Sequence, residues 1–231
     1  MSDVLEDSMK IRDSLFEVGR YFSEIDSLNC IIEVQLPGRM EENSCVRQVV
    51  FEDTFHEDSS DGRITQLSSL AFNLKSKGKK KFDGSISIQI VAFGSPQDAF
   101  YGIPVLIASA GNYVLELADY DATHWFPSKV EKSVGEIIST ECGRRVVRVK
   151  SQSESSGDTT EYYFVIPLLK LQSASSLASL VYEPLSILLS CLFDGRSLGE
   201  NDIKKFEHAI PIQAIPEGDR IGYQADFNGY Q

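Results

Sequence analysis

The sequence has 231 residues, of which 42% are hydrophobic and 24% are charged. This composition is close to that of soluble globular proteins and excludes the low-hydrophobicity range of disordered chains. The 34 acidic and 22 basic side chains give a formal net charge of −12. That charge argues against general binding to duplex nucleic acid, because neutralising phosphates requires an excess of Lys and Arg. A local basic patch is still compatible with it.

The cysteines and the apolar stretches indicate where the protein resides. Four cysteines are widely spaced and form no CxxC pair, so no disulfide framework is predicted and a reducing compartment fits best. The first residues are acidic and lack the features of an export signal. The most apolar stretch, from Pro184 to Phe193, has ten residues, whereas a membrane span needs about 20. We therefore expect a cytoplasmic protein that binds no membrane.

Residues 3–26 are predicted to form an amphipathic helix. Its apolar residues recur at three- and four-residue steps with charged residues between them, and either Ser2 or Asp3 can cap it. The same spacing is typical of a coiled-coil seam. The helix is therefore expected to pack on the core or to dock on a partner chain, which includes the possibility of an oligomer. Its apolar residues are Val4, Ile11, Leu15, Val18, Phe22 and Ile25.

Residues 29–170 show a period of two and are predicted to form a sheet. A first strand is expected over residues 31–36, because Pro37 and Gly38 end the alternation. A cleaner alternation follows at residues 85–90, where isoleucines alternate with Ser85, Ser87 and Gln89. That pattern is typical of a half-buried strand, so the sheet is expected to have one face exposed to water.

Two antiparallel pairs are predicted within this region. Residues 105–107 and 113–117 flank a turn at residues 109–112 and favour a hairpin. Residues 145–150 and 162–166 alternate on either side of a polar loop, which favours a second pair.

Residues 173–210 are predicted to be helical, and residues 211–231 to be a tail. The first part is rich in leucine and ends at Gly195, with Pro184 either kinking the helix or starting its main part. A shorter helix over residues 201–208 is expected to be capped by Asn201. The fold class predicted is α+β in a single domain over residues 1–231, with a mainly antiparallel sheet of hairpins, an N-terminal amphipathic helix and an apolar C-terminal helix packed on the sheet.

Few residues suggest catalysis. The sequence contains no GxSxG, HExxH, GxxxxGK[ST] or GxGxxG motif. Asp119, Asp121 and His124 could bind a divalent metal or act as an acid-base pair, although acidic residues are also common in turns. Cys142 has cationic neighbours that favour a thiolate. The other cysteines, Cys30 and Cys191 above all, are expected to be buried and inert. We predict no catalytic residues, no metal and no cofactor.

The segment from residue 52 to residue 62 is strongly acidic. Asp61 and Gly62 resemble the middle of an EF-hand loop, but the last position of the template would be Ser68, where calcium coordination needs Glu. A solvated acidic loop joining two strands is expected, with recognition of a partner as the alternative.

Five of the chain's lysines lie within seven residues, from position 75 to position 81. This run is either a solubilising hairpin loop or a binding site for an anionic partner. A second basic cluster spans residues 144–150, on a predicted strand. If the two clusters adjoin, RNA binding gains support, with Phe82 or Tyr162 as stacking residues. The candidate partner-binding residues are Lys75, Lys77, Lys79, Lys80, Lys81, Arg144, Arg145 and Arg148.

The sequence favours a non-enzymatic, acidic protein-interaction module. Such a module would be an adaptor, a chaperone- or immunity-type inhibitor, or a subunit of an assembly, and it would bind another protein through charged loops. One alternative is a nucleic-acid-associated subunit that binds RNA or another polyanion through residues 75–81 and 144–150. The other is an enzyme centred on Asp119, Asp121 and His124.

Overall fold

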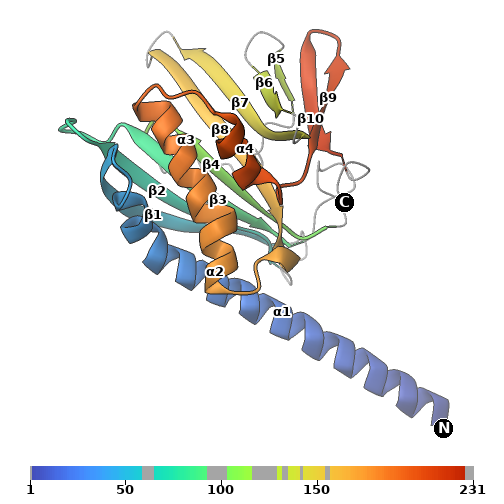
Figure 1. Cartoon of the computed structure of the whole chain (residues 1–231). Coiled ribbons are helices and arrows are strands. Elements are labelled where there is room, and N and C mark those ends of the chain that lie inside the picture. The colour runs from blue at the N-terminus through green and yellow to red at the C-terminus, as the bar shows by residue number, and fades with distance from the viewer. Residues whose placement is uncertain are drawn as a thin grey trace. The chain divides into compact units, whose positions relative to one another are not determined.

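The computed structural model describes residues 2–58, 65–92, 103–115, 129–131, 135–140, 143–153 and 157–226. Helices and antiparallel sheets form an α+β fold, as the sequence predicts (Figure 1). The chain divides into two compact units, Met1–Gln35 and Leu36–Gln231. The first unit is purely helical, and the sheets and remaining helices belong to the second.

Helix α1 runs from Ser2 to Glu41 and is longer than predicted. Both the predicted end at residue 26 and the predicted strand over residues 31–36 are wrong, and the sheet region begins at residue 46 rather than 29. Over six residues the two structures are hard to tell apart, because apolar side chains four apart, such as Ile32 and Leu36, share a face in a strand and in a helix alike. Exposure distinguishes the two. Val34 and Leu36 would share a face of a strand, yet Val34 is 78% exposed and Leu36 is buried.

The main sheet has seven strands in the order β1-β2-β3-β4-β8-β7-β6. Every neighbouring pair is antiparallel, which confirms the predicted pairing of residues 145–150 with 162–166. The strands are β1 (Val46–Asp58), β2 (Thr65–Ser76), β3 (Gly84–Val91), β4 (Val105–Gly111), β6 (Gly135–Thr140), β7 (Gly143–Ser153) and β8 (Gly157–Pro167).

The hairpin predicted around residues 109–112 is wrong. Ser109 and Gly111 continue β4, which pairs with β3 on one side and β8 on the other. Glycine is common in turns, but Gly111 serves close packing within a strand. A Cβ atom there would lie 2.6 Å from Cε1 of Tyr113. A small residue at this position therefore marks an aromatic ring packed on the strand.

One face of the main sheet is apolar and is covered by the predicted C-terminal helix. This helix consists of α2 (Ala174–Leu177), a π-helical turn (Ala178–Tyr182) and α3 (Glu183–Phe193), and Ser173 caps its start. The π turn ends at Tyr182, two residues before Pro184, which lacks the N–H that a regular helix needs. Figure 1 shows the helix lying across the sheet, and α3 contacts β4. Its buried residues include Leu177, Val181, Leu185, Leu188 and Leu189.

The segment Ala174–Phe193 is also long and apolar enough to cross a membrane, by length and composition alone. It is the only helix in the described part of the chain that meets this criterion. Four of its leucines, Leu177, Leu185, Leu188 and Leu189, are buried, and the core helix of a globular fold has the same composition.

The opposite face of the sheet is lined by small polar side chains, and we refer to it as the serine face. The sequence predicts that this face is exposed to water, and that prediction is wrong. Ser87 is 7% exposed and Ser109 is 2% exposed. The register places these residues side by side across β2, β3 and β4. The buried polar residues of the serine face are Ser69, Asn73, Ser85, Ser87, Gln89 and Ser109.

The predicted tail contains a hairpin instead. Strands β9 (Ile212–Glu217) and β10 (Arg220–Ala225) pair with each other, and β10 also pairs with β5 (Lys129–Glu131). Gly218 opens the two-residue loop with φ +62°, a conformation that glycine adopts at little cost. Ile212 and Tyr223 join Val105 and Val165 in one apolar cluster. This small sheet therefore covers the β4 and β8 part of the serine face.

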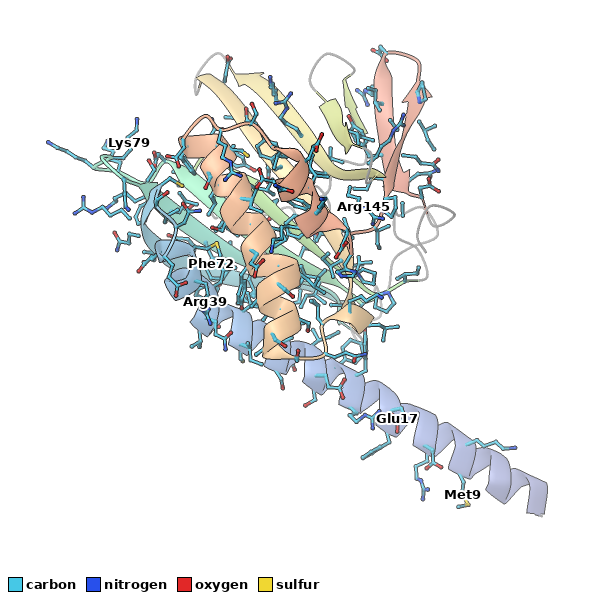
Figure 2. All side chains as sticks on the ribbon, viewed as in Figure 1. Met9, Glu17, Arg39, Phe72, Lys79 and Arg145 are labelled. Carbon is cyan, nitrogen blue, oxygen red and sulfur yellow. The ribbon has the colours of Figure 1, made fainter. Side chains whose placement is uncertain are left out.

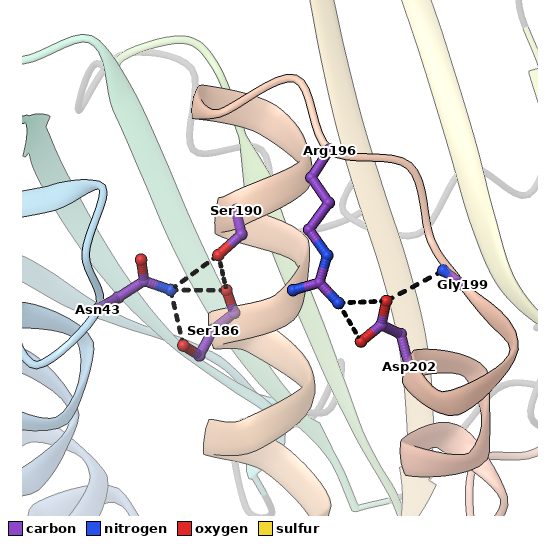
Figure 3. Close-up of polar contacts among 6 residues, drawn as sticks. All are labelled: Asn43, Ser186, Ser190, Arg196, Gly199 and Asp202. Carbon is purple, nitrogen blue, oxygen red and sulfur yellow. Dashed lines mark hydrogen bonds and ion pairs between the residues drawn. The ribbon is translucent and has the colours of Figure 1, made fainter.

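The short helix α4 (Glu200–Ile203) begins one residue earlier than predicted. Gly199 is its N-cap, not Asn201. The backbone N–H of Gly199 donates to Asp202 Oδ2 at 3.0 Å, and Arg196 forms an ion pair with the same carboxylate (Figure 3). The carboxylate thus fixes both the start of α4 and the loop that precedes it.

Asn43 joins the turn before β1 to helix α3. Its Nδ2 donates to the backbone carbonyl of Ser186 at 2.7 Å and to Ser190 Oγ at 3.2 Å (Figure 3). Its Oδ1 accepts a hydrogen bond from the backbone N–H of Cys45 at 2.9 Å. Because the side chain is only 8% exposed, these groups have little access to water if Asn43 is removed.

We expect Asn43→Ala to lower the free energy of unfolding by about 2–3 kcal/mol, because it leaves several buried polar groups without a partner. Urea denaturation measures this change. Asn201→Ala, at an exposed position, serves as the control and should change the free energy by about 0.5 kcal/mol or less. Equal effects of the two substitutions would show that Asn43 is not a structural link.

Candidate functional site

The basic run of the sequence forms the connection between β2 and β3. We call residues 77–81 the lysine turn. Lys75 and Ser76 end β2, and β3 begins at Gly84, which confirms the predicted hairpin. Gly78 has φ +86°, a backbone conformation that strains other residues.

Hydrogen bonds fix both ends of the lysine turn. The carboxylate of Asp83 accepts the backbone N–H of Ser76 at 2.7 Å and the hydroxyl of Ser76 at 2.5 Å. The backbone N–H of Lys77 donates to the carbonyl of Cys45 at 2.8 Å. Hydrogen bonds therefore hold the turn in one conformation. The nearest carboxylate in the sequence, that of Asp83, already accepts hydrogen bonds from the backbone and the hydroxyl of Ser76.

Four lysine side chains of the turn are exposed, and Figure 2 shows Lys79 projecting at the edge of the molecule. Among the described residues, none of these four takes part in an ion pair. Lys75 differs from them, because its Nζ lies 5.0 Å from the ring centre of Phe82 and donates to Gln48 Oε1 at 3.3 Å. The four exposed side chains are Lys77, Lys79, Lys80 and Lys81.

The second basic cluster lies on β7, as predicted, but does not join the first. Strands β3, β4 and β8 separate β2 from β7, a distance of roughly 19 Å at about 4.8 Å per strand. The register also places Arg144 toward the end of the sheet away from the lysine turn. Arg145 is partly buried and donates to the backbone carbonyl of Ala209. Part of this cluster therefore joins β7 to the segment after α4.

The aromatic residues expected beside an RNA site are partly or almost fully covered. Phe82 lies against Lys75, and Tyr162 is 7% exposed. Separate basic clusters and covered rings give no support to the RNA alternative, since binding single strands uses exposed aromatic faces along a basic groove.

The acid and histidine candidates, Asp119, Asp121 and His124, lie outside the described residues, as does Cys142. Within the described residues, no group of three His, Cys, Asp or Glu side chains could hold a metal ion. The acidic run is only partly a loop, because Glu52 to Asp58 belong to β1. Residues 59–62 lie outside the described part.

The described cysteines form no disulfide with one another. Cys30 is exposed on α1, so its predicted burial is wrong, whereas Cys45 and Cys191 are buried. Burial raises the pKa of both of these thiols, which keeps them in the unreactive protonated form.

A carboxyl group is buried on the serine face, and sequence reasoning did not predict it. Glu161 of β8 retains a little exposed surface as a residue, but its carboxyl group is enclosed. Oε2 accepts the hydroxyl of Tyr113 at 2.5 Å and that of Tyr163 at 2.6 Å. Ser109 also hydrogen-bonds to the carboxyl group and lies 2.6 Å from Ser87, oxygen to oxygen.

Loss of hydration dominates the electrostatics of this cluster. Burial raises the pKa of Glu161, and the hydrogen bonds from its hydroxyl neighbours lower it less. Burial and the nearby carboxylate raise the pKa of Tyr163 well above its usual value, so its hydroxyl stays a donor. A buried carboxyl with a raised pKa is a feature of many active sites, but it also occurs in structural networks. Here two tyrosine hydroxyls donate hydrogen bonds to the same oxygen of Glu161, Oε2, which favours a structural role for the carboxyl group.

The serine-face cluster could be recognised only through strand register. Glu161, Gly111 and Ser85 lie opposite one another on β8, β4 and β3, yet they are far apart in the sequence. No local motif joins them, and their alternation with apolar residues is typical of a water-exposed face.

Comparisons with known proteins give no relative. No family model, no curated protein and no solved structure matches the chain.

Glu161→Gln tests the burial of the carboxyl group. A raised pKa in the folded state means that the carboxyl favours folding at low pH, and that this contribution is lost as the pH rises through the folded pKa. Gln carries no charge at any pH, so the Tm of the variant relative to wild type should increase from pH 5 to pH 8. Glu200→Gln, at the surface, accounts for the change in net charge. A Tm difference for Glu161→Gln that stays constant or declines with pH would contradict a buried carboxyl.

Proposed function

We propose that the chain is a non-enzymatic protein-interaction module that binds an acidic surface of a macromolecular partner through the lysine turn. The observation that carries this proposal is the exposure of four lysine side chains on a turn whose backbone is held by hydrogen bonds. A flexible solubilising loop has no need of such bonds. A binding loop benefits from them, because less conformational entropy is lost when the partner binds.

Charge supports an acidic partner. The net charge of the chain is −12, so an acidic partner is repelled by most of the molecule and attracted to the lysine turn. Such segregation orients the encounter and disfavours other contacts. The partner therefore approaches the end of the sheet where β2 and β3 meet.

The location of the protein is part of this proposal. We place it in a reducing, cytoplasmic setting, and the free thiols of Cys30, Cys45 and Cys191 are compatible with that environment.

Replacing three lysines tests the proposal. The triple variant Lys79→Ser, Lys80→Ser and Lys81→Ser should weaken binding to an oligoglutamate peptide by roughly tenfold and flatten its salt dependence, because fewer charged contacts remain. Fluorescence anisotropy at several salt concentrations measures both quantities. An oligoadenylate RNA of equal charge serves as the second probe.

A control with the same change in net charge is Lys170→Ser, Lys204→Ser and Arg220→Ser, all at exposed positions. It should bind the peptide within about twofold of wild type, because long-range charge effects are screened at physiological salt. Equal losses in the two triple variants would reduce the effect to net charge and contradict a site. Tighter binding of the RNA than of the peptide would favour the nucleic-acid alternative.

A further inference from the structure

The first unit of the chain, Met1–Gln35, consists of helix alone. A single helix has no core of its own, and most helices in proteins depend on packing of an apolar face. The described side chains between residues 9 and 20 are exposed. A helix with such an exposed polar surface is stabilised when an apolar face of it packs against a partner.

The sequence of this stretch follows a heptad repeat. Position d holds Val4, Ile11 and Val18, and position a holds Ser8, Leu15 and Phe22. The alternating steps of four and three residues are unbroken from residue 4 to residue 22. We end the seam at Phe22 because the next two register positions, Ile25 and Asn29, are already buried within the chain. Phe16, 72% exposed, occupies position b and lies outside the seam.

Charges beside the seam indicate what pairs with it. In a parallel pair of identical helices, position g of one copy faces position e of the next heptad in the other. Asp7 occupies position g and Arg12 occupies position e. In a parallel pair, Asp7 of each copy would therefore face Arg12 of the other, which gives two contacts between opposite charges. In an antiparallel pair, e faces e, and Arg12 of one copy would meet Arg12 of the other. The charge pattern thus favours copies of this chain in parallel register.

We propose that residues 4–22 of α1 form a parallel coiled coil with the same segment of further copies of this chain. The β-branched residues at position d and Leu at position a favour more than two strands. Arg12 is available for this contact, because its side chain is 70% exposed and it pairs with the neighbouring Asp13, whose side chain is 65% exposed. The lysine turn takes no part in this assembly, so the two proposals can fail independently.

Charge reversal in the full-length chain tests the assembly. Light scattering during size-exclusion chromatography should give wild type a mass that is at least twice 25.7 kDa. Arg12→Glu places like charges at positions g and e and should raise the dissociation constant by roughly tenfold, and Asp7→Lys should do the same. The double variant restores opposite charges, so its dissociation constant should return to within about threefold of wild type.

The control is Arg20→Glu at position f, opposite the seam. It removes two ion pairs within the helix, with Glu17 and Glu24, and should leave the mass of the assembly unchanged. Leu15→Asp should give a monomer with the circular dichroism of a folded sheet. A monomeric wild type, a double variant as weak as the single variants, or equal weakening by Arg20→Glu would overturn the proposal.

Discussion

The central strands of the main sheet, β2, β3, β4 and β8, are buried on both faces, and most of the other features of the second unit follow from that constraint. One face carries isoleucines and phenylalanines and is covered by the helix Ala174–Phe193. The serine face is buried as well, so each of its polar groups must find a partner inside the protein. Ser87, Ser109 and Glu161 find such partners in one another and in two tyrosines. Because burial disfavours the charged form of the Glu161 carboxyl, its pKa is raised and it stays protonated to a higher pH than usual.

Because of the same constraint, we propose that partners bind outside the faces of the sheet. The faces of the sheet are occupied, and the described thiols and carboxyl groups inside it are held in unreactive states. Among the described residues, the lysine turn at the β2 and β3 end and the helix of the first unit are exposed charged surfaces, and we propose these two as the binding surfaces. Both present charges in an ordered backbone, the first through the contacts of Asp83 and the second through helical register. The two surfaces differ in chemistry, and each suits a different kind of partner.

Local patterns predicted the fold class, the β7–β8 pair, the leucine-rich helix and the lysine hairpin, because each depends on residues close together in the sequence. The errors arose where two periods coincide or where burial depends on distant segments. Residues 31–36 fit a strand as well as a helix, and only the opposite exposure of Val34 and Leu36 separates the two. Ser85 and Ser87 have the alternation of an exposed face, which cannot reveal that other segments cover them. Glu161 was missed because only Tyr163 is close to it in the sequence, whereas its other partners, Ser109 and Tyr113, come from β4 and from the segment after β4.

Direct titration of Glu161 tests the burial of the serine face most sharply. The carbon-13 chemical shift of its carboxyl group, followed against pH by NMR and assigned with Glu161→Gln, reports its protonation. With the face buried as described, the carboxyl should titrate above the ordinary value of 4.5. Titration at or below that value would mean that water reaches the serine face, as the alternation in the sequence suggests, and would contradict a sheet buried on both sides.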